Sequence, residues 1–172
     1  IKGHNIDNLF SELTLGYHDS ISFDSLPIPF ACVSENLVLG EEYVFREGIL
    51  STAMRASMAI PGVFTPVRLN DMVLIDGGVV NNYPVDVARQ MGADVIIGVD
   101  VQSELRPGEE LNNTGTILAQ LVELMGQEKY LENLNNTNVH IKVNVKGYSA
   151  ASFTHTAIDT LIVRGTYAAE SQ

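Results

Sequence analysis

The chain has 172 residues, of which 45% are hydrophobic and 18% are charged. This length and composition predict one soluble globular domain, and no apolar run approaches the roughly 20 residues that a membrane-spanning helix needs. Acidic residues outnumber basic ones by 21 to 10, and the resulting net charge of -11 disfavours binding to nucleic acid. The single cysteine, Cys32, excludes a disulfide bond within these residues.

The first third of the sequence predicts a helix, a strand, a hairpin and a second helix. Apolar residues at helical spacing indicate the first helix over residues 5–15, with Asn5 as its N-cap. The segment "FACVSE" at 30–35 is typical of a core strand, and Gly40 marks the turn of a hairpin in "NLVLGEEYVFREG". The spacing of apolar residues predicts the second helix over residues 50–57.

The middle of the chain predicts a hairpin followed by a helix and a buried strand. Two β-prone runs flank Asn70-Asp71 in "TPVRLNDMVLIDGG", so the second strand is expected to end at Asp76. Pro84 suits the first turn of a helix, and the continuous apolar run "DVIIGVDV" at 94–101 indicates a strand covered on both faces. Strand, helix and strand in this order predict a right-handed crossover.

The last third begins with an exposed loop at 102–113 and continues into elements with clear periodicity. An apolar stripe predicts a long helix that runs to about residue 134, and the stripe of 117–134 is expected in the core rather than on a membrane-docking surface. Alternation over 139–145 indicates a strand near a sheet edge, and a final helix is expected after a Thr156 cap. This alternation of strands and helices predicts a three-layer α/β sandwich with a mostly parallel central sheet.

Asp76 is the first candidate functional residue, because it lies where a buried strand ends. Working residues gather at the carboxyl ends of strands in parallel sheets. Aspartate and glycine are also ordinary turn residues, so "DGG" at 76–78 taken alone equally fits a plain turn. The two glycines permit close approach of other groups, and Asn81-Asn82 adds polar groups beyond the strand.

A wider segment, residues 26–101, resembles the bacterial branch of the patatin-like phospholipase family. The resemblance is carried by "ASMAIPGVFTPV" at 56–67, "LIDGGVVNNYPVDVA" at 74–88 and "GADVIIGVDV" at 92–101, in this order and at close spacing. It implies a three-layer α/β sandwich and a lipid acyl hydrolase that uses a serine and an aspartate without histidine. Its lipid ester substrates leave peripheral contact with a membrane open.

The resemblance implies roles for individual residues. The Asp-Gly-Gly motif of the family corresponds to Asp76, Gly77 and Gly78, which makes Asp76 the expected general base. A serine hydroxyl needs such a base because it is a poor nucleophile while protonated. Ser57, Pro61 and Phe64 are the expected lining of the substrate pocket.

The nucleophile of the family is missing from the sequence. No serine here is flanked by glycines in the Gly-x-Ser-x-Gly pattern, and no glycine-rich oxyanion stretch precedes Asp76. Residues 1–172 are therefore expected to be the C-terminal part of a single patatin-like domain, with the N-terminal half that bears the nucleophile as a missing partner. Ser57 lies on a predicted helix without an elbow, which favours a packing or capping role over nucleophilic attack.

Other site classes find little support in the sequence. His4, His18, His140 and His155 lack metal-ligand spacing, and neither a phosphate loop nor a dinucleotide motif occurs, so no metal and no cofactor is expected. Two functions remain open: a parent lipid hydrolase of which this chain carries the aspartate, and an inactive fragment or pseudoenzyme that acts as an assembly module. A cytoplasmic and an exported protein both fit the sequence.

Overall fold

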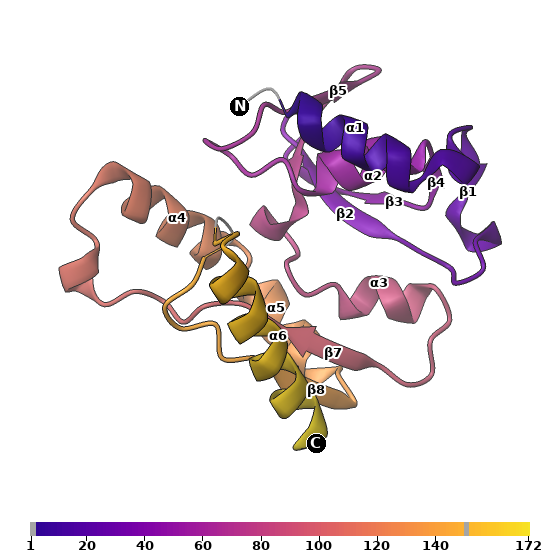
Figure 1. Cartoon of the computed structure of the whole chain (residues 1–172). Helices are drawn as coiled ribbons and strands as arrows, with labels where there is room; N and C mark the ends of the chain where they lie inside the picture. The colour runs from indigo at the N-terminus through magenta and orange to yellow at the C-terminus, as the bar shows by residue number, and fades with distance from the viewer. Residues whose placement is uncertain (1–2, 150–151) are drawn as a thin grey trace.

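The computed structural model describes residues 3–149 and 152–172, which form a mixed α/β structure. Figure 1 shows an N-terminal group of elements and a C-terminal group, with α3 between them. The N-terminal elements are α1 (His4–Leu13), β1 (Ile21–Ser22), β2 (Cys32–Asn36), β3 (Glu41–Phe45), β4 (Glu47–Gly48), α2 (Leu50–Ser57), β5 (Val67–Leu69) and β6 (Met72–Asp76). The later elements are α3 (Val85–Gln90), β7 (Ile97–Asp100), α4 (Thr114–Met125), α5 (Gln127–Asn135), β8 (Val139–Lys142) and α6 (His155–Glu170).

Both predicted hairpins are confirmed. Strands β2 and β3 pair antiparallel across the turn that ends at Gly40, whose φ of 69° is accessible to glycine without strain. Strands β5 and β6 pair across the Asn70-Asp71 turn, where Asn70 adopts a φ of 52°. Asparagine tolerates this left-handed conformation better than most residues, which explains its place in the turn.

The four-stranded sheet has the order β3-β2-β6-β5, and each neighbouring pair is antiparallel. Parallel pairing among the described residues is limited to β7 and β8. The expectation of a mostly parallel central sheet is therefore not met in this part of the chain. The predicted crossover from β6 through α3 to β7 is also wrong, because β6 and β7 belong to different sheets.

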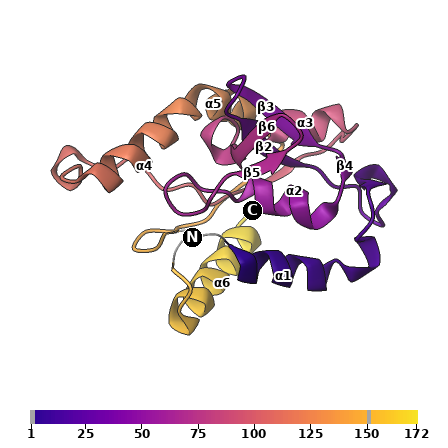
Figure 2. The same cartoon turned by 90° about the horizontal axis from the view of Figure 1, so that it is seen from above.

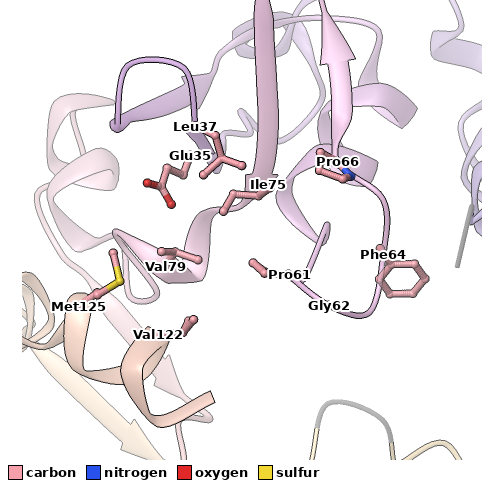
Figure 3. Close-up of a pocket in the computed structure, with 10 residues that line it drawn as sticks. All are labelled: Glu35, Leu37, Pro61, Gly62, Phe64, Pro66, Ile75, Val79, Val122 and Met125. Atoms are coloured by element: carbon pink, nitrogen blue, oxygen red, sulfur yellow. The ribbon is translucent and has the colours of Figure 1, made fainter. Parts of the chain in front are cut away.

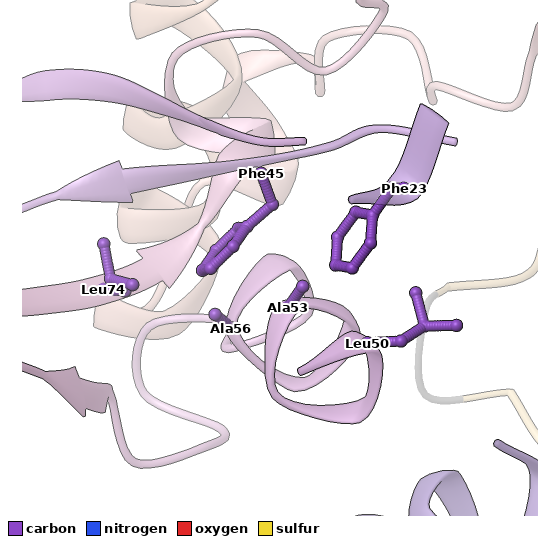
Figure 4. Close-up of a cluster of buried hydrophobic side chains, with 6 residues drawn as sticks. All are labelled: Phe23, Phe45, Leu50, Ala53, Ala56 and Leu74. Atoms are coloured by element: carbon purple, nitrogen blue, oxygen red, sulfur yellow. The ribbon is translucent and has the colours of Figure 1, made fainter. Parts of the chain in front are cut away.

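Helix α2 packs on one face of the four-stranded sheet and lies between that sheet and α1 (Figure 2). The main hydrophobic core fills the contact between α2 and the sheet (Figure 4), and its buried members are Phe23, Phe45, Leu50, Ala53, Ala56 and Leu74. Small alanines on the inner face of α2 let the helix approach the strands closely. This packing fixes the position of β6 and hence of its last residue.

Strand β7 differs from its prediction. The apolar side chains of Ile97 and Val99 are 65% and 57% exposed, whereas Gly98 and Asp100 between them are buried. A continuous apolar run cannot distinguish a strand covered on both faces from one whose outer face stays open, because both have the same composition. No described element covers this outer face.

The helix ends also differ from expectation. The long helix predicted to run to about residue 134 is interrupted at Gly126, which separates α4 from α5. The apolar stripe of α4 was expected in the core, but Leu118 and Met125 are 57% and 65% exposed. The N-cap of α1 is Gly3 instead of Asn5, and α6 is capped by Thr154 instead of Thr156. The side chain of Thr154 accepts a hydrogen bond from the N–H of Ala157, the usual N-cap contact.

Candidate functional site

Asp76 is the last residue of β6, as predicted, and its position is fixed from two sides. Its backbone N–H donates to the carbonyl oxygen of Ala59 at 3.1 Å, which ties the strand end to the segment after α2. Its side-chain Oδ1 accepts a hydrogen bond from the N–H of Gly78 at 2.7 Å. Across the sheet it is paired with Ser34 of β2. The carboxyl group is therefore held by the turn that it begins.

Both glycines after Asp76 are closely surrounded, Gly77 by backbone and Gly78 by the ends of side chains. A Cβ atom on Gly77 would lie 2.2 Å from the carbonyl oxygen of Val33, and one on Gly78 would lie 2.8 Å from Oδ1 of Asn82 and 2.9 Å from Oδ1 of Asp76. Real Cβ atoms do not approach oxygen so closely. The Asp-Gly-Gly sequence thus lets the turn fold tightly against β2 with the carboxylate at its start.

The surroundings of Asp76 favour its protonated form relative to an aspartate in water. Burial raises the pKa of the Asp76 carboxyl group, and the hydrogen bond from the Gly78 N–H opposes this shift in part. A carboxylate with a raised pKa is a stronger base at neutral pH than an exposed one. This is the direction that a proton-accepting role requires.

The predicted pocket residues lie in two places. Pro61 and Phe64 line an apolar pocket of about 400 Å³, whereas Ser57 does not border it. Ser57 ends α2, and its side chain is hydrogen-bonded to Cys32. Burial raises the pKa of the Cys32 thiol to about 12 despite this bond, so the thiol stays protonated at neutral pH. Neither side chain is arranged as an activated nucleophile.

Comparison with known proteins finds similarity around this site. Residues 11–89 match the model of the family described as patatin-like phospholipase. This part of the chain is thus similar to patatin-like phospholipases. The matched residues include the α2 segment, the loop with Pro61 and Phe64, and the whole Asp-Gly-Gly turn.

Relatives of the chain come from bacteria and mammals. An uncharacterized NTE family protein of Mycobacterium bovis is 32% identical over 108 residues, which is 63% of this chain and 18% of the relative. Another from Mycobacterium tuberculosis is 35% identical over 91 residues, 52% of this chain and 25% of the relative. Patatin-like phospholipase domain-containing protein 7 of Rattus norvegicus is 34% identical over 113 residues, 60% of this chain and 8% of the relative. The chain thus spans a quarter or less of each of these relatives.

A polar network lies behind the Asp-Gly-Gly turn, and the sequence predicted only part of it. Asn81 donates to Oδ1 of Asp86 at 2.9 Å and accepts from Asn133 of α5 at 3.1 Å. Lys129 bonds Asp86 at 2.9 Å and Glu42 of β3 at 2.6 Å. Burial alone would raise the pKa of Asp86, but the bonds from Asn81, Lys129 and Asn133 together hold it below its usual value. The position of Asn81 directly after the strand indicated a polar role for it. Nothing in the local sequence around Glu42, Lys129 or Asn133 predicted that they would join it.

A second buried acid, Asp100 at the end of β7, has all its partners within the protein. Its Oδ2 accepts from Tyr130 at 2.7 Å, from Lys142 at 3.0 Å and from His140 at 3.1 Å, and its Oδ1 accepts from the N–H of Gln102 at 2.9 Å. Burial raises its pKa, but these bonds outweigh burial and lower the pKa overall. A carboxylate that is satisfied in this way joins β7, β8 and α5 and leaves nothing for a substrate.

Within residues 3–149 and 152–172, no cluster of three or more histidine, cysteine, aspartate or glutamate side chains could hold a metal ion. Over the same residues, no helix has the length and apolar character needed to cross a bilayer.

Glu35 is a buried acid that the sequence did not single out as a site residue. Its signal was an isolated acidic residue inside the apolar segment "FACVSE".

Proposed function

We propose that the protein is a lipid acyl hydrolase in which Asp76 is the general base. The main support for this proposal is the half-buried Asp76 carboxylate at the end of β6. It accepts a hydrogen bond from the Gly78 N–H, and burial raises its pKa. In this proposal the nucleophile is a serine in a part of the protein outside these 172 residues, together with the oxyanion loop. The match of residues 11–89 to the model of patatin-like phospholipases supports a lipid ester as the substrate.

The proposed reaction has two stages. In the first, Asp76 takes the proton of the serine hydroxyl while the serine oxygen attacks the ester carbonyl, and the proton then passes to the leaving alcohol. In the second, Asp76 takes a proton from water, the resulting hydroxide attacks the acyl-enzyme, and the serine leaves with that proton. Two-stage transfer needs a base whose pKa lies nearer the working pH than that of an exposed aspartate, which the burial of Asp76 supplies.

The apolar pocket is the proposed place for the hydrocarbon part of the lipid. Pro61 and Phe64 belong to the loop that follows α2, and Ala59 of the same segment accepts the hydrogen bond from the Asp76 N–H. This bond fixes the loop relative to the proposed base. Ser57 is the last residue of α2 and lies just before this loop, so its proposed role is to support the position of the loop. A three-layer sandwich with more parallel strands would belong to the larger domain of which these residues are a part.

An assembly module without activity is the second candidate, and the open outer face of β7 favours it. Val95, Ile97, Val99 and Val101 are between 57% and 67% exposed, so four apolar side chains lie on one surface. Apolar surface of this kind marks sites where other polypeptide packs. Absence of ester hydrolysis by the wild-type full-length protein would favour this candidate over the hydrolase.

Substitution of Asp76 in the full-length protein tests the hydrolase proposal. Asp76→Asn keeps the shape of the side chain and its hydrogen bond from Gly78, but it removes the base. We expect hydrolysis of a lipid ester to fall by roughly 100- to 10,000-fold, the usual contribution of a general base. Asp71→Asn is the matched control, because Asp71 is exposed in the β5–β6 turn and makes the same change of charge. Equal turnover by the Asp76 variant and the control would remove Asp76 from the mechanism.

A further inference from the structure

The apolar pocket has one charged residue among its ten lining residues. Its walls come from the end of β2, the loop after α2, β6 with the turn behind it, and the C-terminal half of α4 (Figure 3). The lining residues are Glu35, Leu37, Pro61, Gly62, Phe64, Pro66, Ile75, Val79, Val122 and Met125. A volume of about 400 Å³ is within the range of small-molecule sites, roughly 300–1,000 Å³.

The sheet register explains why Glu35 faces this pocket. Glu35 is paired with Ile75, and the next pair along the strands is Ser34 with Asp76. Successive side chains of a strand point to opposite faces, and paired residues share a face. Glu35 and Ile75 therefore face the pocket and α4. Asp76 starts from the opposite face, but it is the last residue of β6, where its N–H bonds Ala59 of the segment that leads into the pocket loop.

Glu35 is buried, and one of its two carboxyl oxygens lacks a partner among the described residues. It is only 6% exposed, and its Oε2 atom has no hydrogen-bond partner in the described residues. Figure 3 shows its carboxyl group above Val79, on the left side of the pocket. A buried carboxylate without a partner is costly, and native proteins normally provide one. An external donor in the pocket would supply what the chain lacks.

The pocket is also chemically asymmetric. Figure 3 places Glu35 on the same side as Val79 and Met125, with Pro61 and Phe64 on the other side. A ligand that spans this space therefore meets a carboxylate at one end and an apolar surface at the other. The net charge of -11 further favours a cation over an anion near this site.

We propose that this pocket binds a protonated amine attached to an alkyl chain. The ammonium group donates a hydrogen bond to Oε2 of Glu35, and the chain packs against Pro61, Phe64 and Met125. The ligand class rests on the proposed function only in that the same pocket receives the hydrocarbon part of the lipid. Beyond that shared pocket, the proposal adds a preference for a ligand whose polar end is positively charged. Binding of the amine can be measured without hydrolysis of any ester.

Calorimetric titration of the full-length protein with octylamine tests the proposal, with octanol as the neutral probe of the same length. At pH 7.5 we expect octylamine to bind the wild type roughly tenfold or more tightly than octanol does, because only the amine carries the cation that pairs with Glu35. This comparison uses the wild type alone and does not depend on any variant folding. Equal affinities for the two probes, or no binding of octylamine, would overturn the proposal.

Variants locate the binding. Glu35→Gln should weaken octylamine binding by roughly tenfold or more and leave octanol binding unchanged, which also shows that the pocket is intact. Glu109→Gln is the matched control, since Glu109 is exposed in the 102–113 loop and the change removes the same charge. Asp76→Asn should bind octylamine as the wild type does, so loss of hydrolysis and loss of amine binding are separable. Unchanged octylamine affinity in Glu35→Gln would refute the role of Glu35.

Discussion

Asp76 and Glu35 are two acids on neighbouring strands with opposite surroundings. Burial raises the pKa of both carboxyl groups. Oδ1 of Asp76 has the Gly78 N–H as a donor, whereas Oε2 of Glu35 has no partner in the described residues. The carboxylate of Asp76 is thus stabilised in place as a usable base, while that of Glu35 is a cost to folding that a ligand could relieve.

The pKa of Glu35 predicts a pH-dependent stability. Because the folded-state pKa lies above the unfolded value near 4.5, the folded protein binds the proton more tightly between the two values. Glu35 therefore costs nothing below the unfolded pKa, and its cost grows as pH rises through the folded pKa. We expect the free energy of unfolding of Glu35→Gln, relative to wild type, to rise with pH over that window. Urea denaturation of both proteins between pH 4 and pH 8 measures this rise.

A constant difference between Glu35→Gln and wild type over this pH range would show that the Glu35 carboxyl group is not destabilised by burial. Glu109→Gln again provides the control. Its side chain is exposed, so this change removes the same charge without touching a buried group.

At the scale of elements, the β6 turn is the most constrained feature of the site. The turn packs so closely on β2 that the carbonyl oxygen of Val33 fills the place of a Gly77 side chain. The same closeness places the start of the turn beside Ser34 and fixes the direction of the Asp76 carboxyl group. The site geometry therefore depends on backbone contact between β2 and the turn.

Gly77→Ala tests this contact. The added methyl group must displace the backbone of β2, so we expect a loss of stability of about 3 kcal/mol, at the upper end of typical overpacking. Gly165→Ala in α6 is the matched control, since nothing lies within 4 Å of its Cβ position. That change should raise stability by about 0.5–1 kcal/mol through helix propensity. Urea denaturation distinguishes the two, and a Gly77→Ala variant as stable as wild type would contradict the tight packing of the turn.

Local patterns predicted the elements near the site well. The Asn70-Asp71 turn, the end of β6 at Asp76 and the need for small residues after it follow from turn chemistry and strand periodicity, which act over a few residues. The approach of Lys129 to Glu42 and the exposure of β7 depend on tertiary contacts between distant segments, which short windows do not contain. Glu35 carried only a weak local signal, an acid at the end of an apolar segment, because its burial follows from the register with β6.

At the scale of the whole molecule, the described residues form two groups with separate small cores. The N-terminal core joins α2 to the antiparallel sheet, and a second cluster around Tyr83, Val85 and Ile96 joins α3 to α5. The family match begins within α1, covers the rest of the first group and ends within α3. The proposed base and the pocket loop thus lie in the matched part, and the outer face of β7 lies beyond it.

Labelling with a fluorophosphonate, which reacts with activated serines, tests the central claim most directly when intact mass is measured afterwards. We predict one adduct on the full-length protein, a labelling rate reduced by roughly 100-fold or more in Asp76→Asn, and no adduct on the isolated 172 residues. Circular dichroism of each sample verifies that it is folded. An adduct on the isolated 172 residues, or an unchanged rate in folded Asp76→Asn, would contradict a serine outside this chain that is activated by Asp76.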